Sequence, residues 1–514
     1  MNEFDFQNMF VFDMANNHQG DLEHGLNIVR QIGAVARKHD VKGVMKFQFR
    51  QLDTFIHPDH KKDSKVKHID RFLSTELKLD QYQVMLDAVR EEGMLAMCTP
   101  FDEESVDAIT AMGYDFLKIA SCSAKDWPLL EKAAEACMPV VVSTGGLRAK
   151  EIDDVVSFFE HRGVATAIMH CVSIYPIPDE EFHLNQIDIL RRRYRKQVIG
   201  WSTHEDPDNM LPGQLAAAKG ACIYERHVGV ATDVIKLNTY SSTPEQVDRW
   251  IAAIHYAQKL CGDNKPRAIS VAEKESIDSL RRGVYLKKNL KIGATVKPED
   301  VYFAMPFIEG QLESGRWKDG TVINVNASKD APLMAENISV PAPSPISVLK
   351  SAVHEVKALL NEASVELNSN FQLEFSHHYG MENFREVGAL IINCINREYC
   401  KKIIVQLPGQ KHPVHYHKRK EETFQILHGV LETEVDGRRR TLHPGETALV
   451  QPGVWHRFWT DTGCVFEEVS TTHYNNDSVY NDRRINEMQR EQRKTVAEHW
   501  GRFVMAAGND KQAQ

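Results

Sequence analysis

Residues 95–121 read LAMCTPFDEESVDAITAMGYDFLKIAS, and this stretch carries the pattern that decides the fold. A short apolar run at 95–98 is followed by apolar residues at helical spacing and then by a second short apolar run at 116–120. Short apolar runs that alternate with helical segments indicate parallel strands joined by helices. The stretch therefore predicts a strand, a covering helix and a neighbouring parallel strand.

The same unit recurs along the first half of the chain. The apolar runs lie at residues 10–14, 44–47, 95–98, 116–120, 139–142, 167–170, 198–201 and 222–224. Eight such units in about 265 residues is the usual size of a closed (β/α)8 TIM barrel, an α/β fold. We predict this barrel for residues 1–265. An open doubly wound sheet is the alternative, because it is built from the same units.

Polar side chains follow the predicted strands, where a barrel of this kind carries its catalytic groups. Lys46 and Lys118 stand at two strand ends, and hydroxyl groups follow others, at Ser121, Ser143, Thr144 and Ser202. Two lysines with hydroxyl groups nearby are suited to bind a phosphate group. A lysine at such a position could instead form a Schiff base with a carbonyl substrate. His204 and His227 end adjacent strands and are candidates to share a divalent metal.

The order of these motifs resembles the sialic acid synthase family over residues 8–262. The matching pieces include Asn-His-x-Gly at 17–20, Lys-Phe-Gln at 46–48, Thr-Pro-Phe-Asp-x-Glu-Ser at 99–105, Lys-Ile-Ala-Ser at 118–121 and Glu-Arg-His at 225–227. Enzymes of that family condense phosphoenolpyruvate with an open-chain amino sugar and release phosphate. The resemblance implies a transferase that forms a carbon–carbon bond in carbohydrate biosynthesis.

The resemblance also implies roles for individual residues. The residues expected to hold phosphoenolpyruvate are Lys46, Thr99, Lys118, Ser121, Ser143, Ser173 and Ser202. Gln48 and Tyr175 would face the sugar. His204 and His227 would bind Mn²⁺ or Mg²⁺ and polarise the sugar aldehyde. We therefore predict Lys46, Lys118, His204 and His227 as the catalytic residues.

Four positions depart from the family pattern, and all of them concern acidic residues. Asp13 and Ser123 stand where the family usually has Glu, and Thr203 stands where it has Asp. The segment 236–242 lacks the acid of the family's Gly-Pro-Asp/Glu motif. We interpret this as a changed sugar acceptor. A barrel without catalytic activity is the alternative.

Residues 270–345 resemble the small antifreeze-like (SAF) domain that follows the barrel in this family. The resemblance implies a homodimer formed through this domain. In the family the domain lends an arginine to a neighbouring subunit's site, whereas residues 304–307 here read AMPF. Residues 341–347, rich in Pro and Ser, are typical of a linker.

From about residue 368 the chain changes to short apolar runs at close spacing, which is typical of an all-β barrel or sandwich. His415, His417, Glu422 and His456 stand in the spacing of the two cupin motifs, and this part resembles the cupin family. Three imidazoles and one carboxylate suit a divalent metal of the Mn, Fe, Ni or Zn type. We predict a cupin over 365–480 and a helical tail over 481–514.

The sequence leaves three hypotheses for the role of the predicted cupin. It could accompany a phosphoenolpyruvate-dependent synthase as a metal-binding module. It could be the catalytic part of a sugar isomerase or epimerase, with the barrel as a scaffold. A non-catalytic carbohydrate-binding assembly is the third hypothesis.

Composition limits the class of protein. The 514 residues carry a formal net charge of −9, which argues against a protein that binds nucleic acid through clustered cations. No apolar run is long enough to span a membrane, and no signal peptide is visible, so we expect no membrane contact. The nine cysteines include no C-x-x-C pair, which is typical of reduced thiols and predicts a cytoplasmic protein.

Overall fold

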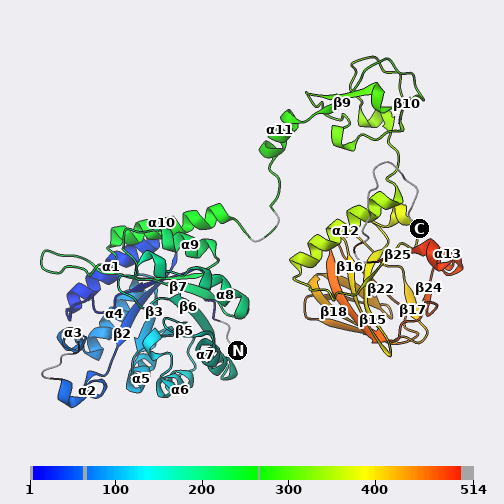
Figure 1. Cartoon of the computed structure of the whole chain (residues 1–514). Coiled ribbons are helices and arrows are strands. Elements are labelled where there is room, and N and C mark those ends of the chain that lie inside the picture. The colour runs from blue at the N-terminus through cyan, green and yellow to red at the C-terminus, as the bar shows by residue number, and fades with distance from the viewer. Residues whose placement is uncertain are drawn as a thin grey trace. The chain divides into compact units, whose positions relative to one another are not determined.

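The structure is a computed structural model that describes residues 4–61, 66, 68–263, 265, 267–498 and 500. The chain divides into two compact units, and the boundary between them in the sequence lies between Arg267 and Ala268 (Figure 1). None of the described helices is both long and apolar enough to cross a membrane.

Eight parallel strands close into a barrel in the first unit. They are β1 (Met9–Asp13), β2 (Lys42–Phe49), β3 (Leu95–Pro100), β4 (Phe116–Ile119), β5 (Val140–Ser143), β6 (Thr166–Cys171), β7 (Ile199–Ser202) and β8 (Ile223–His227). Each strand pairs with the next, and β8 closes the ring against β1 with Asp13 opposite His227. Closure excludes the open doubly wound sheet and confirms the predicted (β/α)8 barrel.

Helices surround this barrel. The longer ones are α1 (Leu22–Lys38), α4 (Leu79–Glu91), α5 (Glu103–Met112), α6 (Trp127–Glu135), α7 (Ala149–His161), α8 (Asn185–Arg193), α9 (Leu211–Ala218) and α10 (Pro244–Cys261). Two short helices, α2 (Leu52–Phe55) and α3 (Ile69–Ser74), lie in the loop after β2. The Asp21 side chain caps α1 by accepting the N–H groups of Glu23 and His24, which fixes where that helix begins.

Strand alternation separates the barrel core from the polar site. In β2, Val44 belongs to the apolar layer inside the barrel, whereas Met45 and Phe47 pack outward against the helices. Side chains two residues apart point to the same face of a strand. Lys46 and Gln48 therefore follow Val44 on the inner face and lie above the apolar layer, towards the carboxyl ends of the strands.

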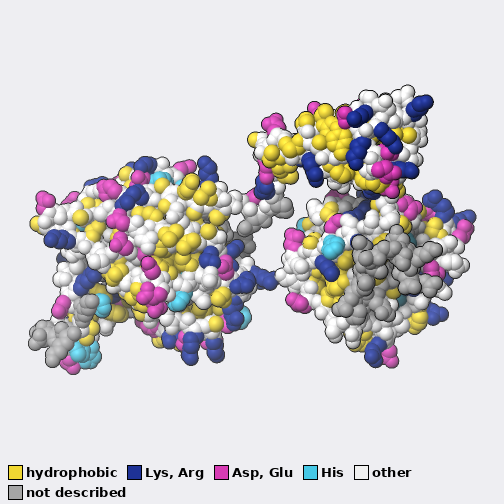
Figure 2. All heavy atoms as spheres, turned by 45° about the horizontal axis from the view of Figure 1, so that its top comes forward, with side chains coloured by type: hydrophobic (Ala, Val, Ile, Leu, Met, Phe, Trp, Pro, Cys, Tyr) yellow, Lys and Arg dark blue, Asp and Glu magenta, His cyan; other side chains and the backbone are white. Residues whose placement is uncertain are grey.

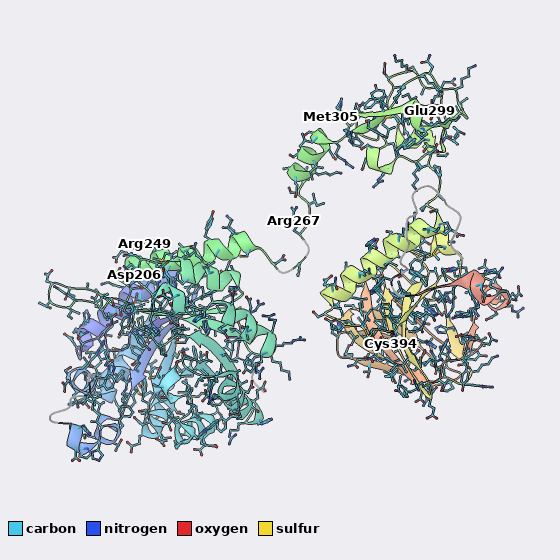
Figure 3. All side chains as sticks on the ribbon, in the orientation of Figure 1. Asp206, Arg249, Arg267, Glu299, Met305 and Cys394 are labelled. Carbon is cyan, nitrogen blue, oxygen red and sulfur yellow. The ribbon has the colours of Figure 1, made fainter. Side chains whose placement is uncertain are left out.

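The second unit begins with a small region of short strands. It contains α11 (Val271–Leu280), β9 (Gly283–Leu286), β10 (Thr295–Val296), β11 (Val301–Ala304), β12 (Thr321–Ile323) and β13 (Ile338–Ser339). The strands form two small sheets, β10-β12-β13 and β11-β9, around their own apolar core. Met305, labelled in Figure 3, follows β11 directly.

The rest of the second unit is a two-sheet β structure, as predicted for a cupin. One sheet has the order β21-β18-β23-β16-β15-β14-β25 and the other the order β20-β19-β22-β17-β24. The strands are β14 (Gln372–Ser376), β15 (Ala389–Asn396), β16 (Tyr399–Gln406), β17 (His415–His417), β18 (Glu422–Gly429), β19 (Leu431–Val435), β20 (Arg438–Leu442), β21 (Thr447–Val450), β22 (His456–Trp459), β23 (Cys464–Thr471), β24 (Ser478–Tyr480) and β25 (Lys494–Glu498). The two sheets enclose the cupin interior.

Two segments differ from their sequence-based predictions. The predicted linker 341–347 contains the start of a helix, α12 (Pro345–Glu362), because Ser344 caps it and Pro345 fits its first turn. The predicted helical tail contains only the short helices α13 (Arg483–Glu487) and α14 (Arg490–Arg493) before the strand β25. β25 pairs antiparallel with the open edge of β14, and this pairing outweighs local helix propensity. The tail beyond residue 500 lies outside the described residues.

Candidate active site and metal centre

Two buried lysines share one carboxylate at the carboxyl ends of the barrel strands. Lys46 Nζ of β2 lies 2.8 Å from Glu225 Oε1 of β8, and Lys118 Nζ of β4 lies 2.5 Å from Glu225 Oε2. Ser202 donates a hydrogen bond to the same carboxylate at 3.1 Å. Glu225 therefore connects three strands and holds both ammonium groups in place.

A second carboxylate links this pair to a histidine. Asp13 Oδ2 of β1 lies 2.9 Å from Lys46 Nζ and 3.4 Å from His227 Nδ1. Gln48 donates to the same oxygen at 3.3 Å. Asp13, noted in the sequence as a departure from the family pattern, is thus built into the site.

Burial and ion pairing act against each other on these groups. Burial would lower the pKa of Lys46, but Asp13 and Glu225 outweigh it and raise that pKa above its ordinary value. For Lys118, burial dominates and lowers the pKa. Burial would raise the pKa of Glu225, but Lys118 and Lys46 hold it well below its ordinary value. Lys46 and Glu225 consequently keep their charges at neutral pH.

Hydroxyl groups beside the lysines converge around Gly145. A Cβ at this position would overlap Ser173 Oγ and lie 2.7 Å from Ser121 Oγ, so any larger residue would displace these two hydroxyl groups. The Gly145 N–H donates to Ser121 Oγ at 3.0 Å. Ser143 is buried nearby at the end of β5, and the buried Thr99 hydroxyl has no partner among the described residues. These donors suit the oxygens of a phosphate group.

His204 and His227 lie side by side, with ring centroids 5.3 Å apart. Burial, followed by His227, lowers the pKa of His204 to about 3, and burial also lowers the pKa of His227. His204 Nδ1 lies 3.1 Å from the Val172 carbonyl, which can only accept, so Nδ1 carries the proton and Nε2 keeps a lone pair. The two imidazoles can each offer a lone pair to a cation, but together with Asp13 they do not form a group of three ligands close enough to hold one ion among the described residues.

The side of the site predicted to face the sugar is more open. The Tyr175 ring is half exposed and lies 4.1 Å, centroid to centroid, from the His204 ring. Gln48 borders a small cavity of about 30 Å³ that is also lined by Asn16, Arg50 and Thr75.

Arg50 and Glu225 belong to the barrel site although sequence reasoning did not include them. The Arg50 guanidinium lies between the rings of Phe72 and Phe101, 4.1 and 3.6 Å from their centroids, and donates to Gln48 at 3.2 Å. Burial lowers the pKa of Arg50 to about 10, which leaves it charged at neutral pH. Strand alternation could have found both residues. Each stands two residues from a predicted site residue, and side chains two residues apart along a strand point to the same face.

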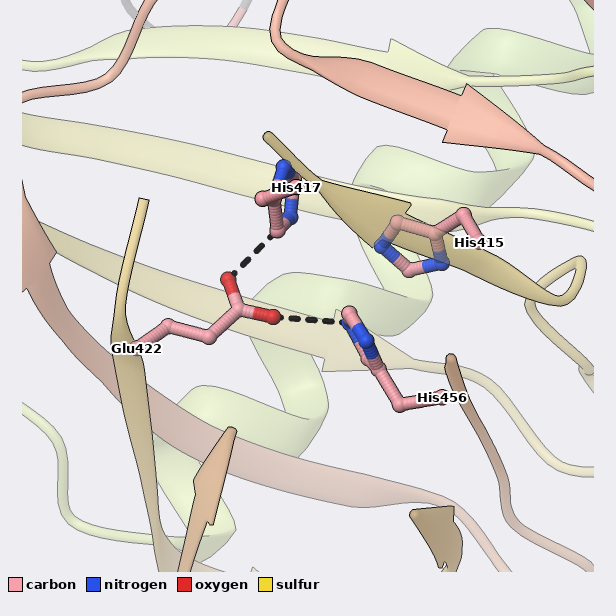
Figure 4. Close-up of side chains that lie close together, drawn as sticks. All are labelled: His415, His417, Glu422 and His456. Atoms are coloured by element: carbon pink, nitrogen blue, oxygen red, sulfur yellow. Dashed lines mark ion pairs between the residues drawn. The ribbon is translucent and has the colours of Figure 1, made fainter. Parts of the chain in front are cut away.

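The cupin interior holds the four residues predicted as metal ligands (Figure 4). His415 and His417 come from β17, Glu422 from β18 and His456 from β22, and all four are buried. One ligand atom of each lies within 4.8 Å of the others. Among the described residues, no other group of three or more His, Cys, Asp or Glu side chains lies close enough together to hold one ion.

Hydrogen bonds outside the cluster orient the imidazoles. His415 Nδ1 lies 3.0 Å from the Pro413 carbonyl, and His456 Nδ1 lies 3.1 Å from the Val454 carbonyl. Carbonyl oxygens only accept, so these Nδ1 atoms carry the protons and Nε2 keeps its lone pair. Such backbone contacts are the usual support of metal-binding histidines.

His456 Nε2 and Glu422 Oε1 lie 2.8 Å apart. With the His456 proton on Nδ1, as the contact to the Val454 carbonyl indicates, both atoms are acceptors, and neither has a donor among the described residues. Two buried acceptors so close to each other are unfavourable unless a cation lies between them. Burial lowers the pKa of His415 and of His417, which keeps both rings ready to ligate. The donor set therefore fits a divalent metal.

Comparison with known proteins gives two family matches and several relatives. Residues 34–266 match the NeuB family, and residues 403–467 match the cupin domain family. A crystal structure from Chromobacterium violaceum, of a protein named for spore coat polysaccharide biosynthesis, is 45% identical with a TM-score of 0.63. The likeness covers 65% of this chain and 100% of that one.

Two further relatives are named as synthases. The N-acetylneuraminate-9-phosphate synthase of Drosophila melanogaster is 30% identical over 222 residues, 42% of this chain and 59% of that protein. The N,N′-diacetyllegionaminic acid synthase of Campylobacter jejuni is 24% identical over 340 residues, 61% of this chain and 98% of that protein.

Proposed function

The chain belongs to the NeuB family through its barrel and carries a cupin domain in its C-terminal part, and from this premise we propose that it condenses phosphoenolpyruvate with an open-chain sugar. Its named relatives make sialic, legionaminic and pseudaminic acids, and such enzymes are transferases that form a carbon–carbon bond. The product would be a nonulosonate-type sugar acid.

The observation that carries the proposal is the pair of buried lysines, together with the serine hydroxyl groups that converge around Gly145. Lys46 and Lys118 are held 2.8 and 2.5 Å from one carboxylate, so both amino groups are in position before the substrate arrives. Preorganised cations stabilise developing negative charge without reorganisation. The hydroxyls of Ser121 and Ser173 supply hydrogen bonds to the same group.

The reaction then follows from charge placement. Carbon 3 of phosphoenolpyruvate attacks the sugar aldehyde, which forms the new bond and leaves a cationic centre at carbon 2. Water adds at carbon 2, and one of its protons goes to the former aldehyde oxygen, which becomes a hydroxyl. The carbon–oxygen bond to phosphate then breaks, the second proton leaves with the phosphate, and the 2-keto acid remains. Lys46 and Lys118 hold the phosphate throughout, with Thr99, Ser143 and Ser202 as further donors.

The sugar would lie on the side of Gln48, Tyr175 and Arg50. His204 and His227 would hold the metal of the barrel, which we propose to be Mn²⁺ or Mg²⁺. When bound, such an ion supplies Lewis-acid polarisation of a carbonyl. The acids expected at residues 123 and 203 are a buried Ser and a buried Thr, which supports a changed acceptor.

Phosphate release tests the proposal. Full-length protein, Mn²⁺ and phosphoenolpyruvate are incubated with a panel of neutral, amino and phosphorylated aldoses. We expect release that depends on one class of aldose, at least 100-fold reduced in Lys118→Met and unchanged in the exposed control Lys150→Met. No aldose-dependent release, or an active Lys118→Met, would contradict the proposal.

A second candidate function is sugar isomerisation or epimerisation at the cupin. It is favoured by four buried ligand candidates, of which one carboxylate oxygen and one imidazole nitrogen have no partner. This function predicts sugar interconversion without phosphoenolpyruvate that is lost in His415→Gln and kept in His204→Gln. We propose a Mn, Fe, Ni or Zn ion for this site. Sugar binding by calorimetry without turnover in either assay would favour the third hypothesis, a carbohydrate-binding assembly.

We also propose that residues 270–345 are an antifreeze-like (SAF) domain that forms a homodimer. Hydrophobic side chains gather on one face of this region in Figure 2. Val271 and Leu280 of α11 are 74% and 71% exposed. Light scattering of the full chain should give twice the monomer mass, and Val271→Asp with Leu280→Asp should reduce it. A monomeric wild type would contradict the dimer.

The cytoplasmic location stays a prediction.

A further inference from the structure

Ion pairs fill the cupin interior around the four ligand candidates. Lys420 contacts both Glu422 and Glu468, and Lys402 contacts Glu468 at 3.1 Å. Nearby, Lys494 of β25 and Arg490 of α14 lie 2.5 and 2.6 Å from Glu374 of β14. The described part of the cupin therefore carries two groups of paired charges, most of them buried, beside its ligand cluster.

Arg493 differs from these residues because no acidic side chain in the described part of the chain forms an ion pair with it. Its side chain is only 9% exposed, and its Nε has no hydrogen-bond partner among the described residues. Its guanidinium carbon lies 5.2 Å from the centroid of the Tyr480 ring. A largely buried arginine whose Nε has no partner and which forms no ion pair among the described residues is costly unless a ligand supplies the negative charge.

Tyr480 connects Arg493 to the ligand cluster. The ring of Tyr480 stacks on the ring of His415, with centroids 5.5 Å apart and planes 22° apart. The Tyr480 hydroxyl lies 2.9 Å from His378 Nε2, and the buried His378 Nδ1 has no described partner. Arg493 and His378, each with a nitrogen that has no described partner, thus both contact Tyr480, whose ring stacks on the ligand candidate His415.

The balance of charge points to a negatively charged ligand. The basic residues of the interior are Lys402, Lys420, Lys494, Arg490 and Arg493. The acidic ones are Glu374, Glu422, Glu468 and Asp477. Without the partly exposed Arg490 the charges balance, but a divalent ion on the four ligands would leave an excess of two positive charges.

We propose that the cupin interior binds an acidic sugar whose carboxylate pairs with Arg493. The proposal rests on the proposed metal site, because the excess positive charge includes that ion. Arg is suited to a carboxylate because its planar fork donates two parallel hydrogen bonds. The 2-keto sugar acid that the barrel would release belongs to this ligand class, so the cupin would bind a compound of the same class as the barrel's product.

Calorimetry on full-length, Mn²⁺-loaded protein tests this inference. The probes are two matched pairs, glucuronate with glucose and N-acetylneuraminate with N-acetylmannosamine. A Lys118→Met background removes binding of acids in the barrel. We expect each acid to bind at least tenfold more tightly than its neutral partner.

Variants then assign the preference to Arg493. Arg493→Met should abolish it, Arg493→Lys should keep part of it, and the exposed control Arg483→Met should keep all of it. Metal content and circular dichroism check that each variant is folded. Equal binding of acid and neutral sugar by the parent, or a preference that survives Arg493→Met, would overturn the inference.

The two proposals fail in different assays. Arg493→Met on the wild-type barrel should release phosphate at the wild-type rate. Loss of sugar-dependent release with intact acid binding would count against the condensation alone. Absence of metal would count against the cupin metal site, and the acid preference would still be measured in the metal-free protein.

Discussion

At the scale of single residues, the barrel site depends on Glu225. This carboxylate accepts hydrogen bonds from Lys46, Lys118 and Ser202, so it sets the separation of the two ammonium groups. We predict that Glu225→Gln lowers kcat/KM for phosphoenolpyruvate at least tenfold, because a neutral amide no longer positions the lysines. Steady-state phosphate release measures this effect. The exposed Glu398→Gln serves as the control, and equal kinetics in both variants would contradict the assigned role.

Glu374 gives a pH-dependent prediction at the same scale. Burial would raise its pKa, but Lys494 and Arg490 outweigh burial and lower it to about 2, against an ordinary value of 4.5. A lowered carboxyl pKa stabilises the fold above pH 4.5, and this contribution, about 3 kcal/mol, is lost as the pH falls towards 2.

Hydrogen exchange in β14 and β25 measures this prediction. Wild-type protection of these strands should fall between pH 4.5 and 2 more steeply than in Glu374→Gln. The variant should already be less protected at pH 7, since it leaves Lys494 without its charged partner. Parallel pH profiles for the two proteins would show that the ion pair contributes nothing.

At the scale of elements, α12 belongs to the cupin fold. Val356 and Leu360 of this helix pack in one apolar cluster with Leu373 of β14 and Leu390 of β15. We predict that Leu360→Ala destabilises the cupin by about 2–5 kcal/mol, because it removes buried contacts and leaves a cavity. Urea unfolding followed by exchange protection of β15 and β16 measures the loss. The exposed His354→Ala should change it little, and an equal effect of both would contradict this packing.

Local patterns predicted most elements but misplaced two. Ser344-Pro345 has the composition of a linker, yet the same pair is a helix cap followed by a first-turn proline. Residues 494–498 follow a charged segment that resembles a helix, yet they form β25 because the edge of β14 offers hydrogen bonds. The start of α12 was thus present in the local sequence as a cap, whereas β25 was decided by a distant partner that the local sequence does not contain.

At the scale of the whole molecule, the chain holds two separate candidate sites in two units. We predict that Lys118→Met abolishes phosphate release while the cupin metal stays bound. Glu422→Gln should remove the cupin metal while phosphate release continues, because the cupin ligands take no part in the barrel site. Metal analysis of purified protein, together with the release assay, measures both. Loss of both properties in either variant would show that the sites depend on each other.

The sequence by itself determined the two folds and pointed to residues that the structure brings together at the two candidate sites. Strand alternation placed Lys46 and Lys118 on inner faces, and short spacing placed His415 beside His417, because these relations are local. Only the tertiary structure decided which charges meet. Glu225 lies 179 residues from Lys46 in the chain, and Arg493 meets Tyr480 through packing of the C-terminal segment. Such pairings depend on barrel closure and sheet packing, which bring distant residues together and which no local pattern of residues records.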